Sequence, residues 1–144
     1  MDDKTVYTTL VIAGATPFLA CALLPIAGID SIPPFGKLDQ LASHYGLAIL
    51  CFLTGIHWAT QLYSPDKAPF NLFIGSNLVF LAVWIAYVTS SLGWALATQL
   101  IAFPLLLAID FRLLQAGLIT RHYLGIRFVA TALACFSLLF ILIS

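Results

Sequence analysis

Residues 39–63 read DQLASHYGLAILCFLTGIHWATQLY, and this stretch decides the fold. A helix rises about 1.5 Å per residue, so a helix over this stretch is long enough to cross a hydrocarbon core of roughly 30 Å. The stretch is apolar, with one histidine near each of its ends. It therefore predicts a membrane-spanning helix, and the rest of the chain supplies further spans of similar length.

The composition of the whole chain indicates the same class. Hydrophobic residues make up 62% of the 144 residues and charged residues 8%, against roughly 45–50% and about 25% in soluble globular domains. A soluble chain of this size cannot cover its surface with so few charges. The apolar runs lack the alternation of barrel strands, and backbone groups in lipid must be paired internally, so we expect these runs to be helices.

Turn-forming residues divide the apolar runs. Pro33, Pro34 and Gly36 predict one loop, and the segment from Ser64 to Pro69 predicts another. We predict an all-α integral membrane protein with a single domain over residues 1–144. Its five transmembrane helices are expected at about residues 6–28, 39–63, 70–88, 92–115 and 123–143.

The positive charges predict the orientation in the membrane, because cytoplasmic loops carry an excess of Lys and Arg. One side of the five-span arrangement holds only Lys37. The other side holds the remaining cations, which are Lys4, Lys67, Arg112, Arg121 and Arg127. We therefore expect a cytoplasmic N-terminus and an external C-terminus. The net charge is zero, and no basic cluster is long enough to predict binding of nucleic acid.

Three ionisable side chains are predicted to lie at similar depth, each a few residues from the cytoplasmic end of its span. They are His57, Asp110 and Arg127. Ionisable groups inside spans usually face one another or a wet cavity, so we expect a polar cluster. Gln99 precedes Asp110 by eleven residues on nearly the same helical face and is expected to extend the cluster toward mid-membrane. Asn77 is a candidate partner of the cluster on the third span.

This cluster has two interpretations. In the first, hydrogen bonds between the polar side chains fix the packing of the helices, each contributing about 0.6–2 kcal/mol. In the second, the cluster forms part of a path for protons or substrate, with a histidine that can change charge near neutral pH.

The remaining histidines and the cysteines predict no further site. Two histidines on one span, His44 and His57, are typical of b-type cytochromes, but each haem then needs a second histidine and only His122 remains. A single haem between His57 and His122 stays an alternative. The cysteines lie in separate spans without the clustering that zinc or disulfides require, and they are Cys21, Cys51 and Cys135. We predict no cofactor, no metal ion and no catalytic residue.

The second span also resembles a known family. The residues that carry the resemblance are Tyr45, Gly46, Ile49, Leu50, Phe52, Leu53, Gly55, His57 and Trp58. They resemble the domain of unknown function 3429 family, whose animal members are called transmembrane protein 69. The resemblance implies a small helical protein of the bacterial or mitochondrial inner membrane without an assigned activity. That family accepts Arg or His where His57 stands, which favours a cation facing Asp110 over a haem ligand.

Small residues in the second span allow neighbouring helices to approach closely. We expect a helix-packing motif there, formed by Tyr45, Gly46, Gly55 and Trp58. With almost no loops and little extramembrane surface, the chain is predicted to be a non-catalytic accessory or assembly partner of a larger membrane complex. One alternative is a small proton-linked transporter or channel that uses His57 and Asp110. The other is a membrane redox subunit that binds haem or quinone.

Overall fold

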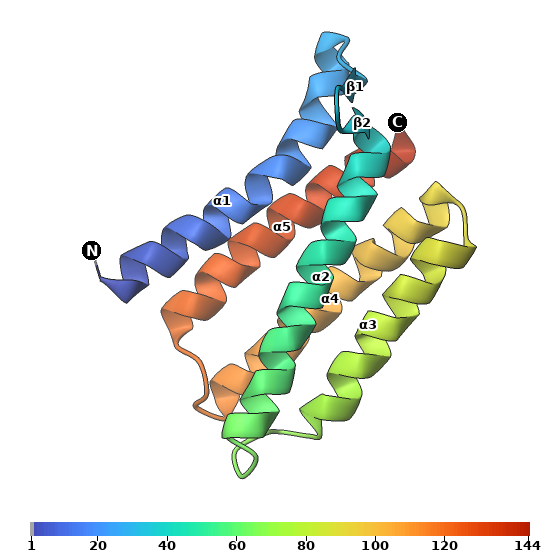
Figure 1. Cartoon of the computed structure of the whole chain (residues 1–144). Coiled ribbons are helices and arrows are strands. Elements are labelled where there is room, and N and C mark those ends of the chain that lie inside the picture. Colours follow the sequence, from blue (N-terminus) through green and yellow to red (C-terminus); the bar gives the residue numbers. More distant parts are fainter. Residues whose placement is uncertain (1) are drawn as a thin grey trace.

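The computed structural model describes residues 2–144 and contains five long helices within that range (Figure 1). The helices are α1 Asp3–Leu23, α2 Leu38–Tyr63, α3 Leu72–Thr89, α4 Leu92–Gln115 and α5 Arg121–Ile143. All five are long and apolar enough to cross a membrane. The prediction of an all-helical protein with five membrane-spanning helices is therefore confirmed, and the chain is a multi-pass membrane protein.

Side-chain caps explain where two helices depart from their predicted bounds. Asn71 Oδ1 accepts hydrogen bonds from the backbone N–H groups of Phe73 (3.0 Å) and Ile74 (3.3 Å), so α3 begins after it rather than at residue 70. The Thr120 hydroxyl accepts from the backbone N–H of Tyr123 (3.1 Å), and α5 therefore begins two residues earlier than predicted. The bounds of α4 are those predicted.

The first span contains a proline that the helix accommodates. Pro17 has no N–H to donate to the Ala13 carbonyl, and the Thr16 hydroxyl donates to that oxygen instead (2.7 Å). The helix continues to Leu23 and then tightens into a short 3₁₀ helix, η1, at Leu24–Ala27.

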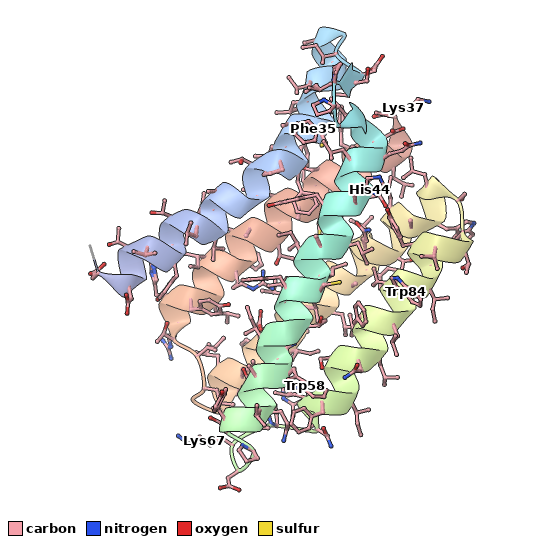
Figure 2. All side chains as sticks on the ribbon, viewed as in Figure 1. Phe35, Lys37, His44, Trp58, Lys67 and Trp84 are labelled. Carbon is pink, nitrogen blue, oxygen red and sulfur yellow. The ribbon has the colours of Figure 1, made fainter. Side chains whose placement is uncertain are left out.

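The segment between the first two spans contains a small hairpin where the sequence predicted only a loop. Its strands are β1, Ser31–Ile32, and β2, Gly36–Lys37, paired antiparallel with Ser31 opposite Lys37. Gly36 has a φ of 84°, a left-handed conformation that favours glycine. Figure 2 shows Phe35 and Lys37 of this hairpin at one end of the molecule and Lys67 at the other.

The helices pack so that α2 is central. α2 contacts α1, α3 and α4. α1 packs mainly on α5, and α5 packs on both α1 and α4. Figure 1 shows α1 and α3 on opposite sides of the bundle. Phe18 of α1 is buried among the helices. Its ring centroid lies 5.7 Å from that of Phe103 and 5.0 Å from that of Tyr45.

The distribution of side chains is that of a protein in lipid rather than in water. Large apolar side chains cover the outside, among them Phe52, Trp94, Ile101 and Phe128. Polar side chains are buried inside the bundle, among them Ser43, Thr54, Gln99 and Ser137. A polar group costs free energy in hydrocarbon unless it is hydrogen-bonded, so the bundle interior is where such groups belong.

Candidate functional site

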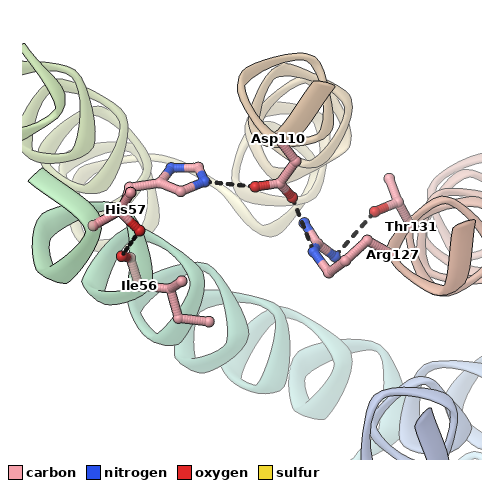
Figure 3. Close-up of polar contacts among 6 residues, drawn as sticks. Ile56, His57, Asp110, Arg127 and Thr131 are labelled. Carbon is pink, nitrogen blue, oxygen red and sulfur yellow. Dashed lines mark hydrogen bonds and ion pairs between the residues drawn. The ribbon is translucent and has the colours of Figure 1, made fainter. Parts of the chain in front are cut away.

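The most strongly polar site in the bundle joins three helices through one carboxylate. His57 of α2, Asp110 of α4 and Arg127 of α5 are 2%, 4% and 5% exposed. His57 Nε2 lies 2.8 Å from Asp110 Oδ1, and Arg127 Nε donates to Asp110 Oδ2 (3.0 Å) (Figure 3). We refer to these three residues as the triad. The structure thus brings together the three ionisable residues that were grouped because they lie at similar depth within their spans.

The hydrogen bonds of the triad assign the protons. The guanidinium of Arg127 stays protonated and only donates, so Asp110 beside it accepts as a carboxylate. The hydrogen between His57 Nε2 and Asp110 Oδ1 then belongs to the imidazole, an assignment that follows from the network. Asp110 therefore uses one oxygen for α2 and the other for α5.

Thr131 contacts the triad and was not predicted from the sequence. Arg127 Nη1 donates to Thr131 Oγ1 at 3.3 Å (Figure 3). The two residues lie one helical turn apart on α5, a spacing that places their side chains on the same face. The four-residue spacing could have predicted a contact between Thr131 and Arg127. A threonine inside an apolar span, however, usually donates its hydroxyl to its own helix backbone, so it does not by itself indicate a polar site.

Two buried atoms of the triad have no hydrogen-bond partner within residues 2–144. They are His57 Nδ1 and Arg127 Nη2. A buried polar atom left without a partner costs roughly 1–3 kcal/mol. The triad is therefore complete around Asp110 but retains hydrogen-bonding capacity on the histidine and on the arginine.

Gln99 does not extend the triad as predicted. It is fully buried and donates from Nε2 to the Ser43 carbonyl oxygen on α2 (2.9 Å). Eleven residues on one helix separate it from Asp110 by about 16 Å, which is too far for its side chain to reach the carboxylate. Gln99 instead packs against Gly46, where an added Cβ would lie 2.0 Å from its Oε1.

Asn77 also lies apart from the triad. Its Nδ2 donates to the Phe73 carbonyl oxygen of its own helix (2.8 Å), and its side chain is exposed. It lines a hollow on the outer surface between α2 and α3. The polar contact predicted between Asn77 and the triad is absent from the described residues, because Asn77 lies on the exposed face of α3.

The residues of the expected helix-packing motif contact three different helices. The Tyr45 hydroxyl donates to the Gly14 carbonyl oxygen of α1 (2.6 Å), and Gly46 receives Gln99 of α4. The Trp58 ring lies 4.5 Å from that of Phe73 on α3. Gly55 faces the surface hollow, with no atom within 4 Å of an added Cβ.

The sequence as a whole matches one family. A family model described as "Protein of unknown function (DUF3429)" matches residues 4–143. The chain belongs to the DUF3429 family. No curated protein and no solved structure matches it. The family description names no activity, so the function of this DUF3429 protein has to be argued from its geometry.

The other two histidines of the DUF3429 chain each have a partner elsewhere. His44 Nδ1 is hydrogen-bonded with the Tyr87 hydroxyl on α3. His122 Nε2 lies 2.8 Å from the hydroxyl of Thr8, which joins the start of α5 to α1. The cysteines are free thiols. Within residues 2–144 no three His, Cys, Asp or Glu side chains gather as a metal site would require.

Proposed function

We propose that this DUF3429 protein is a non-catalytic accessory or assembly subunit of a larger complex in the bacterial or mitochondrial inner membrane. The observation that supports the proposal is the hollow of about 280 Å³ on the outer surface between α2 and α3. We call it the α2–α3 groove. Its lining residues are Cys51, Thr54, Gly55, Trp58, Ser76, Asn77 and Phe80.

The α2–α3 groove has the composition of a contact between membrane helices. Gly55 and Ser76 are small, and small residues let the backbone of another helix approach closely. Asn77 lies five residues into α3, about 8 Å from its start, so its carboxamide faces the hydrocarbon. A polar side chain there gains about 0.6–2 kcal/mol from a hydrogen bond across a helix interface. A transmembrane helix of another protein would supply that bond.

The triad supports a structural rather than a chemical role within the same proposal. Both oxygens of Asp110 already serve to hold α2 and α5 against α4. The triad therefore holds α2, one wall of the α2–α3 groove, against α4 and α5.

The geometry gives less support to the two alternatives. Proton transfer through His57 draws support from its unpartnered Nδ1, but the carboxylate next to it is fully engaged. A haem between His57 and His122 would displace the contact of His57 with Asp110 and that of His122 with Thr8.

The test blocks the α2–α3 groove without disturbing the bundle. A Cβ at Gly55 meets no atom within 4 Å, so Gly55→Leu is expected to fold normally and to fill the groove. Gly125 of α5 is equally open and exposed, which makes Gly125→Leu the matched control. Each full-length protein is purified from its native membranes in mild detergent, and copurifying proteins are quantified by mass spectrometry.

We expect one membrane protein to copurify in fixed proportion with the unmodified chain and with Gly125→Leu. Gly55→Leu should lose roughly nine-tenths of it, since a loss of about 1.4 kcal/mol changes binding tenfold. A lone monomer from the unmodified chain, or equal recovery with both variants, would refute the accessory role.

A further inference from the structure

A second and larger hollow lies on the other side of α2, between α1, α2 and α5. It encloses about 430 Å³, a volume within the usual range of roughly 300–1,000 Å³ for small-molecule sites. We call it the α1–α5 cleft. Figure 1 shows the N-terminal half of α1 diverging from α2 while it stays beside α5. The walls are mostly apolar and include Leu10, Val11, Phe52, Leu53, Ile56 and Ala130.

Most of the polar lining residues of the cleft lie toward one end. Tyr7 lies near the start of α1, and Tyr123 and Arg127 lie in the first third of α5, while Thr131 lies one turn further along. Phe18 and Phe103 line the opposite end. From Tyr7 to Phe18 the helix rises about 16 Å. This is about half of a hydrocarbon core of roughly 30 Å, so the cleft spans the depth of one leaflet.

Arg127 carries an unused donor just beneath the polar end of this cleft. It is 95% buried, lines the cleft, and directs Nε to Asp110 and Nη1 to Thr131. Its Nη2 has no partner within residues 2–144. A guanidinium binds ester and phosphate oxygens well, and leaving one of its donors unpaired in a buried position is costly. A small rotation of the guanidinium would bring this donor to the polar end of the cleft, beside the apolar channel.

We propose that the α1–α5 cleft binds one phospholipid of the surrounding bilayer. One acyl chain lies along the cleft toward Phe18, and an ester or phosphate oxygen accepts a hydrogen bond from Arg127 Nη2. A bilayer lipid fits because the cleft runs along the helices for the depth of one leaflet, and because the guanidinium of Arg127, whose charge Asp110 already balances, still has a free N–H group for a lipid oxygen. The proposal concerns a different face from the α2–α3 groove and does not depend on a protein partner.

The test fills the cleft from two different helices. Ala130→Phe places a ring in the cleft from α5, and Ala132→Phe places the same ring on the exposed side of that helix as the control. Gly14→Leu fills the cleft from α1, where an added Cβ has only the Tyr45 hydroxyl within reach, at 3.8 Å. Arg127→Lys keeps a cation opposite Asp110 but removes Nη2.

Each full-length protein is purified in mild detergent and titrated with dipalmitoyl phosphatidylglycerol in mixed micelles. Native mass spectrometry counts the lipids that stay bound, and circular dichroism verifies the helical content. We expect one retained lipid on the unmodified chain and on Ala132→Phe. Apparent affinity should fall roughly tenfold or more in Ala130→Phe and Gly14→Leu, and measurably in Arg127→Lys.

Three results would overturn the proposal. Equal lipid retention in all folded variants would show that the lipid binds elsewhere, and no retained lipid on the unmodified chain would show that the cleft does not hold one. Displacement of the phospholipid by stoichiometric decylubiquinone, with an isoprenoid quinone in the extract of the purified protein, would assign the cleft to a quinone. If one cleft variant fails to fold, the other decides the outcome, because they enter from separate helices.

Discussion

Asp110 is the residue on which the charge balance of the interior depends. Replacing it by leucine leaves the Arg127 guanidinium buried without a counterion, and removing one partner of a buried pair costs about 3–5 kcal/mol. We expect Asp110→Leu to lower the free energy of unfolding by about that amount. Unfolding in detergent mixtures of increasing sodium dodecyl sulfate, followed by circular dichroism, measures the change.

The double variant Asp110→Leu with Arg127→Met is the control for this prediction. It removes both charges and should recover most of the lost stability, since apolar replacements of a buried ion pair are often neutral or stabilising. An unchanged unfolding midpoint in Asp110→Leu would contradict a charge balance that rests on this carboxylate.

At the scale of residues, the depth of each ionisable side chain within its span was enough to predict the triad. His57, Asp110 and Arg127 each lie a few residues from the same end of their spans, and ionisable groups in hydrocarbon seek one another. Depth failed for Gln99, because sharing a helical face with Asp110 says nothing about the distance along the axis. It also failed for Asn77, because the exposed face of a membrane helix and its packed face are both apolar.

Among the helices, the close approach of α2 to α4 depends on Gly46. A Cβ there would lie 2.0 Å from Gln99 Oε1 and 2.9 Å from its Cδ, so the amide would have to leave its hydrogen bond to Ser43. We expect Gly46→Ala to destabilise the fold by about 1–3 kcal/mol, the cost of leaving buried polar atoms unpaired. Detergent unfolding monitored by circular dichroism tests it.

The matched control lies on the same helix. Gly55→Ala adds the same methyl group where nothing lies within 4 Å, so it should not destabilise the fold, and the higher helix propensity of alanine should stabilise it by up to about 1 kcal/mol. Alanine has a higher helix propensity than glycine, so propensity cannot explain a loss in either variant. Similar losses in both variants would contradict the approach of Gln99 as the cause.

At the scale of elements, the existence of each helix was predictable, whereas its ends were less so. Hydropathy finds the long apolar runs because the bilayer demands them. It does not separate a capping residue such as Asn71 or Thr120 from the first turn that it caps, since both stand beside apolar residues. The hairpin at Ser31–Lys37 was missed because strands of two residues leave no periodicity to read.

The whole molecule should insert with its N-terminus in the cytoplasm, because five of the six Lys and Arg residues are on the side of the N-terminus and only Lys37 is on the other side. Asp66→Cys lies in the loop after α2, and Ser90→Cys lies at the turn after α3. In intact cells a membrane-impermeant maleimide is expected to label Ser90→Cys but not Asp66→Cys. Asp66→Cys should react once the cells are made permeable.

The unmodified chain is the control, because its three native cysteines lie within helices. The opposite labelling pattern would show an inverted orientation. At this scale the number of spans was predictable, but the packing of α1 against α5 was not. Surfaces that face lipid and surfaces that face another helix are equally apolar, so hydropathy does not say which helices meet.

The partnership of the first helix with the last has a consequence for the order in which the protein is made. A ribosome releases α1 and α4 into the membrane before α5 exists. Until α5 arrives, α1 lacks its main neighbour and Asp110 faces the membrane interior without its arginine. This bundle is therefore completed only after α5 has entered the membrane. An insertion machinery that shelters the unfinished helices, or a protease that recognises the unpaired acid, would act within that interval.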